Sequence, residues 1–217
     1  MSRRIAVVTA GLSQPSSTRL LADRIADAVG AAATARGESV DIDPIELRDL
    51  ATDLVTSVTA GGVPTPALAR ARDRLSSADG LIAVTPVFTG SFSGLFKMFF
   101  DAVDVDALAG MPTIIAATGG SPRHSLVLDH AMRPLFSFLR AVVVPTGVYA
   151  ATEDFGGTEL GGRIRRAADE LAALVVAEPG GAGVFVPAAT DGRPRTSGLA
   201  LRTTVTPFQE LLRGHTG

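Results

Sequence analysis

Short apolar runs alternate with segments of helical spacing along most of the chain, and this alternation constrains the fold more than any other feature. Residues 5–9, 81–85 and 113–117 are continuous apolar runs of strand length. Runs of this kind are typical of strands covered on both faces. The segment 18–35 instead carries apolar residues at the spacing of an amphipathic helix. Strands and helices that alternate in this way build a parallel sheet with helices on both faces.

The full pattern predicts five strands in a three-layer, doubly wound α/β domain. We expect strands at 5–9, 40–45, 81–85, 113–117 and 141–149, and helices at 18–35, 66–77, 92–103, 125–139 and 163–176. Ligands of such sheets bind at the carboxyl ends of the strands, where the strand order reverses. The loops that follow Thr9, Thr85 and Ala117 are therefore the expected location of function.

The last part of the chain differs in composition from the rest. Residues 178–217 are rich in Pro, Gly and polar residues, whereas residues 1–177 carry the strand and helix pattern. We expect one domain over residues 1–177. We expect residues 178–217 to form an extended arm with a short helix at 207–213, docked on its own domain or on a partner subunit.

Charge and cysteine content exclude several classes of function. A formal net charge of −2 disfavours nucleic acid as a partner. The absence of cysteine excludes disulfides, thiolate zinc sites and cysteine nucleophiles. His124 and His130 lie six residues apart, which is not metal-ligand spacing, so we expect no metal site. The longest uncharged run, 81–96, is broken by Pro86 and glycines, so we expect no membrane span, and we expect a cytoplasmic location.

The first of the three loops combines hydroxyl groups with the start of a helix. Its hydroxyls belong to Thr9, Ser13, Ser16, Ser17 and Thr18. Free N–H groups at a helix start attract anions, and hydroxyls add donors that suit phosphate oxygens. Arg19 adds a positive charge nearby. Helix capping alone would explain one serine, whereas five hydroxyls favour a phosphate site. No G-x-G-x-x-G or P-loop motif is present, which disfavours dinucleotide and P-loop nucleotide sites.

The second and third loops are built from small residues. Loop 85–94 allows a planar ligand to approach the backbone, and Phe88 offers an aromatic face. This loop is not a serine-hydrolase elbow, because Phe92 occupies the position of the nucleophile. Gly119 and Gly120 similarly turn backbone amides toward a ligand. We expect His124 to begin a helix or border the ligand, not to act as a base. The lack of a carboxylate pair favours a cofactor that carries the chemistry itself.

These loops resemble those of a known family. Residues 11–18, 85–97 and 118–121 are similar to the NADPH-dependent FMN reductase family. Together with residues 145–149 and 207–212, they resemble flavin reductases that partner luciferase-like monooxygenases. The resemblance implies a flavodoxin-like fold with strand order 2-1-3-4-5. Two departures are Gln14, in a region where relatives often carry a G-S-x-R pattern, and Phe88, where relatives often have Tyr.

The loop chemistry and the resemblance together assign FMN contacts in all three loops. The first loop is expected to hold the phosphate, the second to follow the ring and ribityl chain, and the third to close the ring's other side. The predicted contacts are Ser13, Ser16, Ser17, Thr18, Arg19, Pro86, Val87, Phe88, Thr89, Gly90, Ser91, Thr118, Gly119 and Gly120. The family further implies hydride transfer from NADPH or NADH to flavin N5 without a catalytic side chain, a homodimer or homotetramer, and supply of reduced flavin to a monooxygenase.

Two other functions remain open on the same fold. A quinone or azo-dye reductase would differ in its electron acceptor. A flavodoxin-type electron carrier would not meet NADPH directly. Carriers dock through charge and tend to be strongly acidic, and a net charge of −2 disfavours that interpretation.

Overall fold

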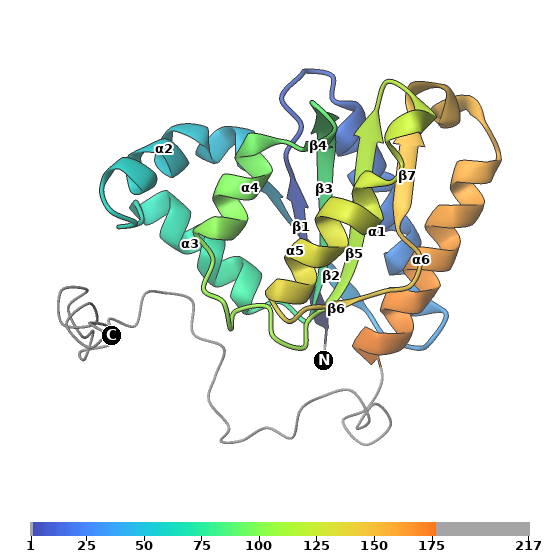
Figure 1. Ribbon diagram of the computed structural model, residues 1–217. Coiled ribbons are helices and arrows are strands. Elements are labelled where there is room, and N and C mark those ends of the chain that lie inside the picture. The colour runs from blue at the N-terminus through green and yellow to red at the C-terminus, as the bar shows by residue number, and fades with distance from the viewer. Residues whose placement is uncertain (1, 177–217) are drawn as a thin grey trace, which may run out of the picture.

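The computed structural model describes residues 2–176, and the predicted arm at 178–217, with its helix at 207–213, lies outside the described residues. A twisted sheet forms the middle layer (Figure 1). Its strands are β1 (Arg3–Thr9), β2 (Val40–Glu46), β3 (Gly80–Phe88), β4 (Ser91–Phe92), β5 (Pro112–Gly119), β6 (Val142–Val143) and β7 (Val148–Ala151).

The strand order confirms the predicted topology. The main path is β2-β1-β3-β5-β6, with β7 also paired to β5, and all of these pairs are parallel. With β6 and β7 counted as one interrupted strand, this is the flavodoxin-like order 2-1-3-4-5. The strand expected at 141–149 is therefore divided in two, because Pro145 in the middle cannot donate to a ladder. The short β4 is a further strand, antiparallel to β3, that was not predicted.

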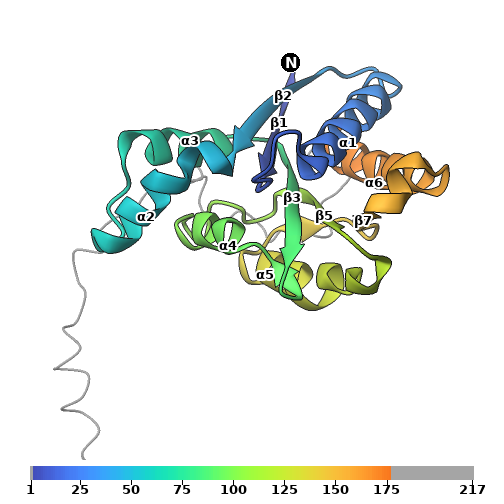
Figure 2. The ribbon, with the colours of Figure 1, turned by 90° about the horizontal axis from the view of Figure 1, so that it is seen from above.

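Within residues 2–176, α-helices cover both faces of the sheet (Figures 1 and 2). They are α1 (Ser17–Thr34), α2 (Ala51–Thr59), α3 (Pro66–Ser76), α4 (Gly94–Asp101), α5 (Arg133–Phe138) and α6 (Glu159–Val176). Helices α1 and α6 pack on one face, against Ile5, Ile82 and Ile114. Helices α2 to α5 pack on the other face. This is the three-layer arrangement expected from the sequence.

Local capping sets the start of several helices. Helix α3 begins at Pro66 because the Thr65 hydroxyl accepts the Leu68 N–H at 3.2 Å and proline suits the first helical position. Helix α4 begins at Gly94, two residues later than predicted, because Ser93 caps it through the Phe96 N–H. The helix expected at 125–139 is a π-turn at Leu128–Met132 followed by α5.

The phenylalanine side chains of α4 form the centre of one core. Phe96, Phe99 and Phe100 are fully buried, and Phe100 lies 4.9 Å from Phe136 of α5, ring centroid to centroid. Edge-on aromatic packing of this kind adds about 0.5–1.5 kcal/mol per pair beyond the burial of apolar area. The helical spacing of these residues in the sequence is typical of either a core or a subunit interface, and the structure places them in the core. Within the described residues, no helix has the length and apolarity needed to cross a membrane.

Candidate functional site

A cleft of about 320 Å³ lies at the carboxyl ends of β1, β3 and β5, as predicted from the fold. It collects residues from all three loops. Nine predicted contact residues line it: Ser13, Ser17, Thr18, Pro86, Val87, Phe88, Thr118, Gly119 and Gly120. Two further lining residues, Leu12 and Thr152, were not predicted. Thr152 follows β7, so the rule that located the other loops would also have found it.

The first loop leads directly into the N-terminus of α1. The Ser16 hydroxyl caps this helix by accepting the Arg19 N–H at 3.2 Å, so its oxygen is engaged in capping and it does not line the cleft. Ser13 and Ser17 are exposed and face the cleft. The first turn of α1 contains no acidic residue. The helix therefore offers unpaired N–H groups and a partial positive charge to an anion at this edge.

A pair of buried hydroxyls joins the first loop to the third. Thr18 and Thr118 are 2% and 4% exposed, and their hydroxyl oxygens lie 2.8 Å apart. These residues come from α1 and β5, which are 100 residues apart in sequence. This bond gives both buried hydroxyls a protein partner and links the first loop directly to the third.

Arg19 is directed away from the cleft. Its guanidinium binds Asp23 at 2.6 Å and also contacts Glu46, and Glu46 in turn lies 3.9 Å from Arg48. Hydrogen bonding to Asp23 raises the pKa of Arg19 above its ordinary value, although burial opposes the change. To reach a phosphate, the guanidinium would have to leave two carboxylates. The structure therefore gives the first loop N–H and hydroxyl donors, without a free cation among the cleft residues.

The second loop is a tight hairpin between β3 and β4. Thr89 and Gly90 both have positive φ, 50° and 79°, and Phe88 pairs with Ser91 across them. Two consecutive positive φ angles are the mark of a type I′ turn, which suits a two-residue hairpin. Phe88, 48% exposed, borders the cleft, whereas Thr89, Gly90 and Ser91 do not line it.

A buried threonine holds this hairpin to the sheet. The Thr85 hydroxyl accepts the Ser93 N–H and donates to the Pro86 carbonyl, both at 3.0 Å. Thr85 itself is fully buried. The cleft wall formed by Pro86, Val87 and Phe88 therefore rests on a satisfied polar group of β3.

The third loop owes its shape to Gly119 and Tyr149. A Cβ atom added at Gly119 would lie 2.2 Å from the Tyr149 hydroxyl, so only glycine fits there. That hydroxyl donates to the Ser121 carbonyl at 2.7 Å. Burial, and to a lesser degree the charge of Asp154, raises the pKa of Tyr149, which keeps the phenol protonated and able to donate. Beside Gly120 an added Cβ would meet nothing within 4 Å, so the backbone there is open to a ligand.

The side chains that line the cleft carry no charge and include no histidine. His124 belongs to the short 3-10 turn Pro122–His124, is exposed, and borders a separate shallow pocket with Gly90, Arg123 and His130. Among the described residues, no group of three or more His, Asp or Glu is placed to bind a metal. The cleft lining therefore offers hydroxyls, backbone groups and apolar surface, without a carboxylate, imidazole or amine.

The residues present fit a flavin mononucleotide. Hydroxyls and the α1 N-terminus suit a phosphate, and small or apolar side chains leave room for a planar ring. A sheet of order 2-1-3-4-5 with this cleft at its switch point defines a flavodoxin-like, mononucleotide-binding protein.

Comparison with known proteins gives the family. Residues 3–156 match the model of the family described as NADPH-dependent FMN reductase. A Pseudomonas aeruginosa protein, FMN reductase (NADPH), is 40% identical over 178 residues, which cover 79% of this chain and 91% of that protein. The NADH-dependent FMN reductase SfnF of Pseudomonas fluorescens is 40% identical over 181 residues, covering 80% and 94% of the two chains. The chain therefore belongs to the NADPH-dependent FMN reductase family.

A solved structure agrees with this membership. An oxidoreductase from Corynebacterium diphtheriae is similar with a TM-score of 0.79 and 60% sequence identity, over 82% of this chain and 98% of that one. The predicted family, fold and pair of cofactors, FMN with NAD(P)H, are confirmed.

Proposed function

We propose that this protein is an NAD(P)H-dependent FMN reductase in which the cleft at the ends of β1, β3 and β5 holds the flavin. When bound, FMN would supply a two-electron acceptor: one hydride from the nicotinamide and one proton from solvent give reduced flavin and oxidised nicotinamide. The observation that carries this proposal is that three loops far apart in sequence meet in one uncharged cleft beside a helix N-terminus. A site of this composition positions a cofactor and leaves the chemistry to it.

Each wall of the cleft has a distinct task in this proposal. Ser13, Ser17 and the first amides of α1 hold the phosphate, and the capping bond of Ser16 keeps those amides in place. Pro86 to Phe88 flank the ring on one side, and the backbone at Gly119 and Gly120 flanks it on the other. The hydroxyl pair of Thr18 and Thr118 sets the distance between the phosphate end and the ring end.

We further propose that reduced FMN is released to a separate monooxygenase. The phosphate end has no free arginine, because Arg19 is engaged by Asp23 and Glu46. Ser13 and Ser17 are exposed, and Phe88 keeps half of its surface in solvent. A site of this kind favours exchange of the flavin over permanent retention. Ultrafiltration of an anaerobic, NADPH-reduced mixture tests this: reduced FMN should pass the membrane, and its retention with the protein would contradict release.

We also propose that the protein is a homodimer or homotetramer and acts in the cytoplasm, where reduced nicotinamide is formed. Phe138 at the end of α5 is 72% exposed and lies beside Leu135 and Val105 along one hollow. Exposed apolar surface of this kind suits a contact between subunits. Light scattering tests this: Phe138→Ser should lower the particle mass, and an unchanged mass would place the contact elsewhere.

Oxidation of NADPH or NADH by the purified protein in air tests the activity itself. We expect rapid loss of reduced nicotinamide that depends on added FMN. Rapid reduction of a quinone at a rate that does not depend on added free FMN would favour the quinone reductase. FMN binding without any nicotinamide oxidation would favour the electron carrier.

A further inference from the structure

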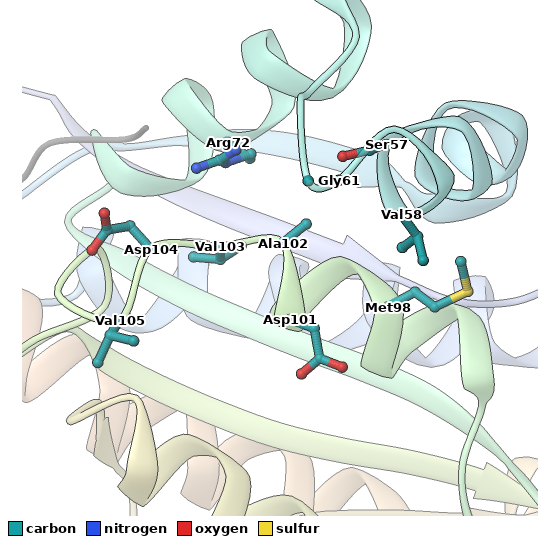
Figure 3. Close-up of a pocket in the computed structure, with 11 residues that line it drawn as sticks. Ser57, Val58, Gly61, Arg72, Met98, Asp101, Ala102, Val103, Asp104 and Val105 are labelled. Carbon is teal, nitrogen blue, oxygen red and sulfur yellow. The ribbon is translucent and has the colours of Figure 1, made fainter. Parts of the chain in front are cut away.

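A second cavity, of about 400 Å³, lies away from the flavin cleft and shares no residue with it. It is formed by α2, the turn after it, α3, and the C-terminal end of α4 (Figure 3). The lining residues are Ser57, Val58, Gly61, Gly62, Arg72, Met98, Asp101, Ala102, Val103, Asp104 and Val105. The proposed hydride transfer does not involve these residues, and the cavity borders the proposed subunit contact at Val105.

The buried arginine of this cavity lacks a partner. Arg72 is only 5% exposed, its Nε has no hydrogen-bond partner, and no ion pair to it is found among the described residues. Arg74, two residues later on the same helix, is instead paired with Asp43. A buried guanidinium N–H without a hydrogen-bond partner is unfavourable. The position therefore calls for an anion that the described part of the chain does not provide.

The Arg72 side chain forms part of the cavity wall. Figure 3 shows the Arg72 side chain extended along one wall, opposite Val103 and Asp104. Neither nearby carboxylate forms a recorded ion pair with Arg72: Asp101 pairs with Lys97, and Asp104 accepts the Asp106 N–H at 3.0 Å. The planar Nε and Nη donors of an arginine match the two oxygens of a carboxylate. The Nε of Arg72, which has no partner, can therefore donate a hydrogen bond to a carboxylate.

The rest of the lining is largely apolar. Val58 and Met98 form one end of the cavity, and Val103 and Val105 form the other (Figure 3). The buried Ser57 adds one hydroxyl. One cationic anchor beside several apolar side chains is suited to a ligand with a single anionic head and an apolar body. The exposed Asp101 and the half-buried Asp104 disfavour a ligand with several negative charges.

We propose that this cavity binds a small apolar monocarboxylic acid, whose carboxylate pairs with Arg72 and whose hydrocarbon body contacts Val58, Met98 and Val103. Helix α4 connects this site to the flavin cleft, since its N-terminus follows the β3–β4 hairpin and its last turn lines the cavity. The proposal does not depend on the reductase activity, so the two can fail separately.

Calorimetric titration with decanoate tests this site, with 1-decanol as the uncharged probe of equal chain length. We expect saturable decanoate binding to the full chain that bound FMN does not prevent. Arg72→Met keeps a long apolar side chain and should weaken decanoate by at least about tenfold, the loss expected for a charge-assisted pair, while leaving 1-decanol unaffected. Arg70→Met, which removes an exposed charge from the same helix, is the matched control and should bind as the unmodified protein does.

Two further variants keep the test decisive. Ala102→Leu should fill the cavity and block both probes, while leaving FMN reduction unchanged. Asp104→Asn should tighten decanoate by removing a repelling charge. Absence of saturable decanoate binding, or equal binding by the Arg72→Met variant, would overturn the proposal. A lower particle mass of the Arg72→Met variant, together with no heat of binding for either probe, would also overturn the proposal. Arg72 would then serve a contact between subunits.

Discussion

The flavin cleft and the Arg72 cavity treat buried polar groups in opposite ways. In the cleft, the buried hydroxyls of Thr18, Thr118 and Thr85 are all paired within the protein. In the cavity, the Arg72 Nε is buried without any partner. The cleft is thus complete before its ligand arrives, whereas the cavity leaves one strong donor to be satisfied from outside. Hydrogen bonds between buried groups of the protein give a pre-organised site, whereas a buried donor without an acceptor in the protein indicates a missing partner.

This comparison also explains which groups remain available at the cleft. Ser13, Ser17 and the amides of α1 are exposed and face a ligand, because the deeper groups already hold one another.

A negative charge at the phosphate end should have the largest effect. Ser17→Glu places a carboxylate in the first turn of α1, where the helix dipole favours it by about 0.3–1 kcal/mol. The same carboxylate repels a phosphate, so the dissociation constant for FMN should rise by about 100-fold, while the melting temperature stays equal or rises. Flavin fluorescence quenching and thermal unfolding measure the two quantities. Ser17→Gln is the matched control and should bind FMN far more tightly than Ser17→Glu; equal affinities would place the phosphate elsewhere.

A methyl group at the third loop should have the next largest effect. Gly119→Ala brings a Cβ within 2.2 Å of the Tyr149 hydroxyl, so we expect a loss of about 2 kcal/mol in the free energy of unfolding. In the Tyr149→Phe background the nearest atom is Cζ at 3.3 Å, and the same change should cost about half as much. Denaturant unfolding of the four proteins measures this coupling. Additive effects would show that Tyr149 does not set the shape of the loop.

The paired hydroxyls and the unpaired arginine should respond with opposite signs. Thr18→Val or Thr118→Val leaves one buried hydroxyl alone and should cost about 1–2 kcal/mol, whereas the double variant should cost less than the sum. Arg72→Met removes a buried, unpaired charge and should raise the free energy of unfolding by about 1 kcal/mol. Urea unfolding at neutral pH measures all four variants. A destabilised Arg72→Met protein would contradict the absence of a partner within the domain.

The smallest effect is expected at His124. Its side chain is exposed and does not line the cleft, so His124→Ala should change the turnover number less than tenfold. Steady-state oxidation of NADPH with saturating FMN provides the value. A larger loss with unchanged FMN affinity would assign His124 a role in proton transfer.

Elements with strong periodicity could be predicted from the sequence. The buried strands β1, β3 and β5 follow from continuous apolar runs, and α1 and α6 follow from a clear apolar stripe. Helix α2 was missed because Leu54 and Ser57 are its only buried residues, so it has almost no stripe. The β3–β4 hairpin was missed because Thr89 has the first positive φ of the turn. Asn or Asp usually occupies this position, and their presence would have indicated a hairpin.

The three loops of the site were predictable because the topology alone brings the carboxyl ends of neighbouring strands together. The role of individual side chains was less accessible. Arg19 looked available for a phosphate, but its orientation depends on Glu46, which is 27 residues away. Whether the Arg72 Nε finds a hydrogen-bond partner depends on how α2, α3 and α4 pack. No local sequence pattern predicts that packing.

The most direct test of the account compares FMN with riboflavin as acceptor in NADPH oxidation by the unmodified protein and by Ser17→Glu. Riboflavin carries the same ring without the phosphate. We expect the unmodified protein to use FMN with a much higher kcat/KM than riboflavin, and Ser17→Glu to lose most of this preference while retaining its riboflavin rate. Equal use of the two flavins by the unmodified protein, or an unchanged preference in Ser17→Glu, would contradict a phosphate site at the N-terminus of α1.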